Sequence, residues 1–198
     1  MADLILASSS AARHQMLTAA GIRFTAVSPR LDEALLRGSL AAEGATPRDM
    51  ADALAEMKAQ KVADRHADAL VLGSDQVLEF EDVAWGKADT RDAARAQLTA
   101  LRGKTHRLWS AAVLFHHRQP IWRTMGMAQL TMRDVSDTYI DAYLDRNWPA
   151  LAGAVGGYHI EAEGVRLFSA IVGDHFTILG LPLIPVLGYL SDRGFIAT

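Results

Sequence analysis

The alternation of short apolar runs with segments of helical periodicity constrains the fold of this chain most strongly. Residues 4–7 and 69–73 are apolar runs that give way to polar residues, as buried strands do. Residues 11–20 and 47–66 repeat apolar side chains at helical spacing, and each segment follows a serine or threonine that can cap a helix. Strands that alternate with helices in this way predict an α/β fold.

The second half of the chain adds strands that can pair as hairpins. Because hairpins interrupt the alternation, we predict a mixed sheet with packed helices and two lobes around a central cleft, in one domain spanning residues 1–198. The patterns indicate helices at 91–101, 136–147 and 182–193, strands at 24–27, 107–115 and 121–132, and a strand, hairpin and strand after the glycine-rich segment 153–157.

Composition argues against several classes of function. The formal net charge of −3 leaves no overall positive field for a nucleic-acid polymer or an anionic membrane. The chain has no cysteine, which excludes disulfides and a thiol nucleophile and suits a reducing compartment, so we expect a cytoplasmic protein. We expect no signal peptide, and the apolar stretch 178–190 falls short of the roughly 20 residues of a membrane span.

A serine-rich segment between the first strand and the first helix has the features of a phosphate site. Ser8, Ser9 and Ser10 offer hydroxyls, and Arg13 follows within the first helical turn. A helix N-terminus adds free backbone N–H groups and partial positive charge, which attract anions. Serine-rich caps are also common, so this segment alone favours ordinary capping with a surface arginine.

Asp75 is predicted at the end of an apolar strand, with another strand at residues 77–80 directly after it. A carboxylate at a strand end can bind a divalent metal or accept a proton from water, and a turn-forming aspartate is the alternative. Glu33, Lys58 and Lys87 would complete the charges that a metal–triphosphate site needs, although each alone also fits a solvated surface.

Signatures of other enzyme classes are missing from the sequence. It contains no GxxxxGK[ST] phosphate loop, no GxGxxG fingerprint and no GxSxG nucleophile elbow. His116 and His117 are adjacent and do not have the spacing of a metal site. Kinase, dehydrogenase and serine-hydrolase functions therefore lose their main support.

Taken in order, these segments resemble the Maf family of nucleotide pyrophosphatases over nearly the whole chain. The opening residues LILASSSAARHQML match the family's LILASxSPRRxxLL, with Gly21 in step. The later matches are Asp32-Glu33, Leu54-Ala55 with Lys58-Ala59, Gly73-Ser74-Asp75, Gly86-Lys87, Leu101 to His106 and Gly180 to Leu183.

The resemblance implies a divalent metal, Mg or Mn, and attack by water between the α and β phosphates of a nucleoside triphosphate. It also makes a homodimer possible. By position in the family's motifs, Asp75 matches the proton acceptor. The residues that the resemblance assigns are catalytic Asp75, Glu33 and Lys87, substrate-binding Ser8, Arg13 and Lys58, and metal-binding Glu33 and Asp75.

The choice of base is expected to depend on Ala12, Gln76 and Glu161. The family branch that acts on dTTP and UTP usually carries Arg, Thr and Gln at these positions, whereas Gln76 and Glu161 look like the branch that acts on 7-methyl-GTP. A carboxylate such as Glu161 can accept hydrogen bonds from guanine N1–H and the 2-amino group. The chain departs from the family pattern at Ala11, Ala12, His14, Ala88 and Ala162.

Two other functions are compatible with the same resemblance. One is a catalytically weak, nucleotide-binding regulator of cell division or septum formation, and the other is a protein-interaction domain. The retained Asp75, Glu33 and Lys87 favour the enzyme, because a protein that only binds nucleotide has no need of a carboxylate beside the phosphates.

Overall fold

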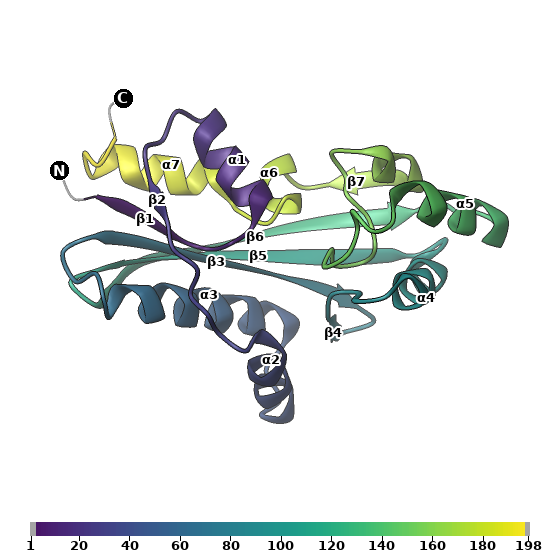
Figure 1. Cartoon of the computed structure of the whole chain (residues 1–198), viewed down its shortest axis with the longest axis horizontal. Coiled ribbons are helices and arrows are strands. Elements are labelled where there is room, and N and C mark those ends of the chain that lie inside the picture. The colour runs from purple at the N-terminus through teal and green to yellow at the C-terminus, as the bar shows by residue number, and fades with distance from the viewer. Residues whose placement is uncertain (1–2, 197–198) are drawn as a thin grey trace.

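The computed structural model describes residues 3–196 and contains a seven-stranded mixed sheet (Figure 1). The strand order is β2-β1-β3-β5-β6-β7, and the short β4 pairs with β3 off this path. β1 lies parallel to β2 and β3, and the other pairs are antiparallel. The strands are β1 (Leu4–Ala7), β2 (Thr25–Ala26), β3 (Leu70–Phe80), β4 (Val83–Trp85), β5 (Thr105–His116), β6 (Gln119–Met132) and β7 (Phe168–Val172).

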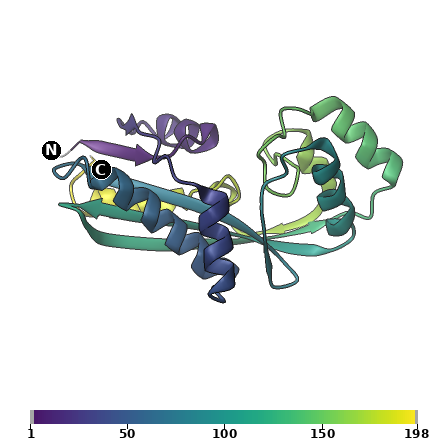
Figure 2. The ribbon, with the colours of Figure 1, turned by 60° about the horizontal axis from the view of Figure 1, so that its bottom comes forward.

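The helices pack on both faces of this sheet. In Figure 1, α3 covers one face near the chain termini, and α1 and α7 cover the opposite face. Figure 2 shows α4 and α5 grouped at the other end of the long strands. The helices are α1 (Ala11–Ala19), α2 (Glu33–Ala42), α3 (Pro47–Ala63), α4 (Arg91–Leu101), α5 (Asp137–Asn147), α6 (His175–Ile178) and α7 (Leu183–Asp192), with a 3₁₀ helix at Glu163–Leu167.

The first lobe is the part of the molecule where α1, α3 and α7 cover the sheet, and alternating side chains of the strands fill two hydrophobic clusters there. Val71 and Val113 point toward α3, whereas their neighbours Leu72 and Leu114 point toward α1 and α7. All four side chains are buried. This alternation follows from the two-residue repeat of a strand, and it buries both faces of the sheet.

A third hydrophobic cluster forms the second lobe. Leu78 of β3 and Leu108 of β5 pack there with Leu98 of α4 and Tyr143 of α5. Because β3 and β5 contribute to the clusters of both lobes, the two lobes share one continuous sheet. The structure therefore confirms the predicted mixed α/β sheet with two lobes.

The prediction that a strand ends at Asp75 is wrong. β3 runs without interruption from Leu70 to Phe80, so Asp75 lies in its middle, opposite Ala111 of β5. The polar sequence from Ser74 to Gln76 suggested a turn. These residues nevertheless pair with β5, and their side chains have partners within the protein. The Ser74 hydroxyl, for example, lies 2.7 Å from the Ala111 carbonyl oxygen.

Two further elements differ from the sequence-based expectation. Helix α2 was not predicted; none of its residues is fully buried, and it packs on the core through the half-buried Leu36 and Leu40. The strand expected after residue 157 is a series of turns followed by the 3₁₀ helix. Gly164 permits this tight path, because a Cβ atom there would lie 2.4 Å from the carbonyl oxygen of His159.

Within residues 3–196, none of the helices combines the length and apolar character that crossing a membrane requires.

Candidate active site

A cleft of about 570 Å³ lies between the two lobes and is lined by residues from both. Helices α1, α2 and α3 and strand β3 form one wall, and the segment 152–161 forms much of the other. The structure brings all the residues selected from the sequence into this one cleft, namely Ser8, Ala12, Arg13, Glu33, Lys58, Asp75, Gln76, Lys87 and Glu161.

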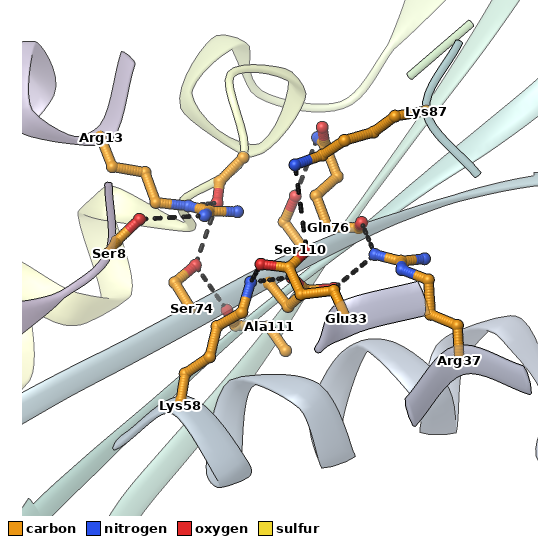
Figure 3. Close-up of polar contacts among 12 residues, drawn as sticks. Ser8, Arg13, Glu33, Arg37, Lys58, Ser74, Gln76, Lys87, Ser110 and Ala111 are labelled. Atoms are coloured by element: carbon orange, nitrogen blue, oxygen red, sulfur yellow. Dashed lines mark hydrogen bonds and ion pairs between the residues drawn. The ribbon is translucent and has the colours of Figure 1, made fainter. Parts of the chain in front are cut away.

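A chain of charged contacts crosses the floor of the cleft (Figure 3). The Lys58 ammonium lies 2.6 Å from Asp75 Oδ1 and 2.8 Å from Glu33 Oε1. Lys87 Nζ lies 3.8 Å from the second carboxylate oxygen of Glu33. The side chains of Asp75 and Lys58 are only 4% and 5% exposed, so this pair is shielded from water and its attraction is strong.

The close approach of α3 to β3 places Lys58 beside Asp75. A Cβ atom on Gly73 would lie 2.2 Å from the Ala55 carbonyl oxygen and 2.6 Å from the Ala59 backbone nitrogen. Only glycine therefore allows the helix to touch the strand here. Lys58, on the same stretch of α3, then reaches the carboxylate that projects from β3 two residues beyond Gly73.

Glu33 is an ionised carboxylate in this network. Its burial tends to raise the pKa, but the hydrogen bond and charge of Lys58, with the charges of Lys87 and Arg37, outweigh burial and lower the pKa of Glu33. Glu33 is the first residue of α2, whose N-cap Asp32 accepts a hydrogen bond from the Leu35 N–H at 3.0 Å. This cap fixes the start of the helix that carries Glu33 into the cleft.

Arg37 is a site residue that the sequence analysis missed. Its Nη2 atom donates to Asp75 Oδ2 at 2.8 Å and to the Gln76 carbonyl oxygen at 3.0 Å. Arg37 follows Glu33 by four residues and therefore lies on the same face of α2. Recognition of α2 in the sequence would have drawn attention to it.

The segment from Ser8 to Arg13 forms a loop of hydrogen-bond donors at the start of α1. The Ser8 Oγ atom accepts from the Ser10 N–H at 3.1 Å and from Arg13 Nη1 at 3.3 Å. Arg13 Nε donates to the Gly180 carbonyl oxygen at 2.7 Å. Burial lowers the pKa of Arg13, and the nearby carboxylates of Asp75 and Glu33 oppose that shift, so the guanidinium stays charged. This geometry suits a phosphate group.

Glu33 and Asp75 are two carboxylates of the cleft that lie close enough together to share one cation. They share the Lys58 ammonium, which shows that their oxygens converge on one cation. No group of three or more acidic or histidine side chains within residues 3–196 is arranged to hold a metal on its own. The donor set therefore fits a cation such as Mg²⁺, which takes one or two carboxylates together with phosphate oxygens.

The three residues expected to select the base differ in how firmly they are held. Gln76 is held firmly, because its Nε2 atom lies 2.9–3.1 Å from the Ser110 hydroxyl and from the carbonyl oxygens of Thr177 and Ile178. Glu161 lies exposed on the cleft wall, and among residues 3–196 its carboxylate makes no hydrogen bond or ion pair. Ala12 also lines the cleft, and its small side chain leaves space beside the loop that begins at Ser8.

Apolar residues also line the cleft. Leu108, Val155, Ile160 and Ile178 line it, and Tyr158 contributes an aromatic ring. Apolar and aromatic side chains beside a few polar groups are typical of a site for a planar organic ring.

The Tyr158 ring is fixed from behind by His106. The Tyr158 hydroxyl lies 2.7 Å from Nε2 of His106, which is buried. Burial lowers the pKa of His106 to about 4, so the imidazole is neutral at pH 7. A neutral imidazole and a phenol can share one hydrogen bond without leaving a buried charge.

Comparison with known proteins identifies the family of this chain. The family model described as "Maf-like protein" matches residues 3–193. A protein of Ruegeria pomeroyi called nucleoside triphosphate pyrophosphatase is 51% identical over 98% of both chains. A Jannaschia protein called nucleoside triphosphate pyrophosphatase 1 is 49% identical over the full length of both chains. A Caulobacter vibrioides protein called nucleoside triphosphate pyrophosphatase is 48% identical over 98% of this chain and 97% of its own. With this agreement over nearly its whole length, the chain belongs to the Maf family.

Proposed function

We propose that this protein hydrolyses nucleoside triphosphates to nucleoside monophosphates and pyrophosphate. The observation that carries the proposal is one cleft that combines a network of charged side chains around the buried Asp75 with apolar residues and the ring of Tyr158. Such a cleft offers partners both for the phosphates and for the base of a nucleotide. The names of the relatives, which share about half of their residues with this chain, support the same reaction.

In this proposal Asp75 accepts a proton from the attacking water. The water oxygen forms a bond to the α phosphorus, the bond from that phosphorus to the bridging oxygen breaks, and pyrophosphate leaves. Lys58 and Lys87 neutralise the charge that develops on the phosphates, and Arg13 with the start of α1 orients them. A divalent cation held by Glu33, Asp75 and the phosphates would supply further charge neutralisation.

The test is pyrophosphate release from a panel of canonical and modified nucleoside triphosphates with Mg²⁺ or Mn²⁺. The matched variant is Asp75→Asn, which keeps the shape of the side chain and removes its basicity. We expect metal-dependent release by the wild type and a loss of at least about a hundredfold in the variant. A folded wild type that releases no pyrophosphate from any nucleotide would contradict the proposal and favour a nucleotide-binding regulator.

We further propose that the preferred base is a guanine, with 7-methyl-GTP as the leading candidate. Glu161 offers a carboxylate on the cleft wall that has no partner among residues 3–196, and the N1–H and 2-amino groups of guanine both donate hydrogen bonds. Methylation at N7 adds positive charge to the ring, which a carboxylate also favours.

Replacement of Glu161 by glutamine tests this choice, because it removes the charge and one acceptor without changing the size of the side chain. We expect kcat/KM for 7-methyl-GTP to fall by about tenfold or more, while that for UTP changes little. An equal loss for both nucleotides would show that Glu161 does not select the base.

A further inference from the structure

The Arg37 guanidinium makes a hydrogen bond to Asp75 and also has a buried N–H donor without an acceptor among the residues that the structure describes. Its Nη2 atom contacts Asp75 Oδ2 and the Gln76 carbonyl oxygen, as described above. Its Nη1 atom is buried and has no hydrogen-bond partner within residues 3–196. A buried charged donor without a partner is unfavourable, so an acceptor for Nη1 would stabilise this guanidinium.

The contacts of Arg37 and Lys58 place a cation at each oxygen of the Asp75 carboxylate. Lys58 holds Oδ1 and Arg37 holds Oδ2, so each carboxylate oxygen already faces a cation. Two cations beside one carboxylate repel both an incoming proton and a metal ion. Departure of one of them would therefore favour both roles of Asp75.

Arg37 is the cation that is better able to move. Lys58 belongs to the long helix α3, nine of whose residues are buried, and it is also tied to Glu33. Arg37 belongs to the shorter helix α2, which has no fully buried residue and packs on the core through the half-buried Leu36 and Leu40. The small side chains on α2 at Ala34 and Ala41 border a second cavity of about 480 Å³, which separates this helix from β4. The helix therefore has space in which to shift.

We propose that Arg37 exchanges partners, pairing with Asp75 in the ligand-free protein and with the substrate's phosphates in the complex. The exchange gives the guanidinium the acceptors that it lacks, because its fork of donors matches the oxygens of a phosphate. It also frees Oδ2 of Asp75 at the moment when substrate is present. This inference rests on the proposed function and adds to it a residue that couples phosphate binding to release of Asp75.

The exchange predicts opposite effects on two ligands that can be measured without turnover. The variant Arg37→Gln should bind Mn²⁺ alone about tenfold more tightly, because the competing cation at Asp75 is removed. It should bind inorganic pyrophosphate in metal-free buffer about tenfold more weakly, because a charge-assisted hydrogen bond is lost. Electron paramagnetic resonance of free Mn²⁺ gives the first affinity, and titration calorimetry gives the second.

Two controls separate partner exchange from a general effect of charge. Arg30 lines the same cleft, and its guanidinium makes no hydrogen bond or ion pair within residues 3–196, so Arg30→Gln removes the same charge without touching Asp75. We expect it to change either affinity by less than about threefold. In an Asp75→Asn background, Arg37→Gln should no longer raise the affinity for Mn²⁺, since the two groups act through one contact.

The proposal is overturned if Arg37→Gln leaves both affinities unchanged, or if its effect on Mn²⁺ persists in the Asp75→Asn background. It is also overturned if Arg30→Gln reproduces both shifts. Circular dichroism of each variant checks that the fold is retained, and Arg37→Ala provides a second variant with the same expected shifts. Failure of the proposed function would instead appear as absence of pyrophosphate release by the wild type, which these binding measurements do not use.

Discussion

The contact between α3 and β3 at Gly73 sets the geometry of the charged site, and Gly73→Ala tests it. An added Cβ atom would lie 2.2 Å from the Ala55 carbonyl oxygen and 2.7 Å from the Ala59 Cβ atom. These are backbone and short side-chain atoms that cannot rotate away. To restore even 3.0 Å, the helix must move from the strand by roughly 0.8 Å, and overpacking of this kind costs about 1–3 kcal/mol.

The same displacement should reduce catalysis in the molecules that remain folded. Lys58 moves with α3, and its ammonium now lies 2.6 Å from Asp75 Oδ1. Catalytic groups tolerate shifts of about 0.5 Å, and a misplacement of about 1 Å lowers rates by about a hundredfold. We therefore expect both a lower free energy of unfolding and a kcat reduced by about one to two orders of magnitude.

Urea unfolding measures the first effect, and pyrophosphate release below the melting transition measures the second. The matched control is Gly188→Ala in α7, where an added Cβ atom meets nothing within 4 Å. That variant should be stabilised by about 0.5–1 kcal/mol, because alanine is the better helix former. If Gly73→Ala unfolds within about 0.5 kcal/mol of the wild type and keeps its kcat, then close packing at Gly73 does not position Lys58.

Two further predictions concern stability. Burial lowers the pKa of His106 to about 4 from its ordinary value of 6.5, so as the pH falls below about 6.5 the unfolded chain takes up a proton before the folded protein does. This difference should cost about 2 kcal/mol of stability between pH 7.5 and pH 5, measured by urea unfolding, and His106→Gln should remove that part of the pH dependence. The buried Ser74 hydroxyl lies 2.7 Å and 3.0 Å from the carbonyl oxygens of Ala111 and Gly180, so Ser74→Ala should cost about 1–3 kcal/mol. A Ser74→Ala melting temperature equal to that of the wild type would show that other donors satisfy these carbonyl oxygens.

Much of the fold could be predicted because its elements carry local signals. The capping residues Ser10 and Thr46 accept hydrogen bonds from the Arg13 and Asp49 N–H groups, as the sequence suggested. The apolar runs of β1 and β3 are strands because both faces of the sheet are covered, which favours continuous rather than alternating apolar residues.

The remaining features depend on contacts between distant residues, which no local pattern reports. Asp75 stays within a strand because Lys58 and Arg37 compensate its charge, and both come from other elements. Helix α2 has only a narrow apolar face, formed by Leu36 and Leu40, because another side carries charged residues into the cleft. The residues of the site could be selected by family resemblance, but Arg37 lies outside the motifs that carried the resemblance.

The continuity of β3 and β5 through both lobes limits how the cleft can adapt to a ligand. Enzymes whose lobes are joined by loops close by rotation about a few hinge residues. Here the ladder from Val71 to Glu79 pairs without a break with β5, and eleven residues of β3 span about 36 Å. Rotation of one lobe against the other would bend this ladder. The continuous sheet therefore sets the width of the cleft. Adjustment to different nucleotides is expected in parts outside the sheet, such as α2 and the segment 152–161.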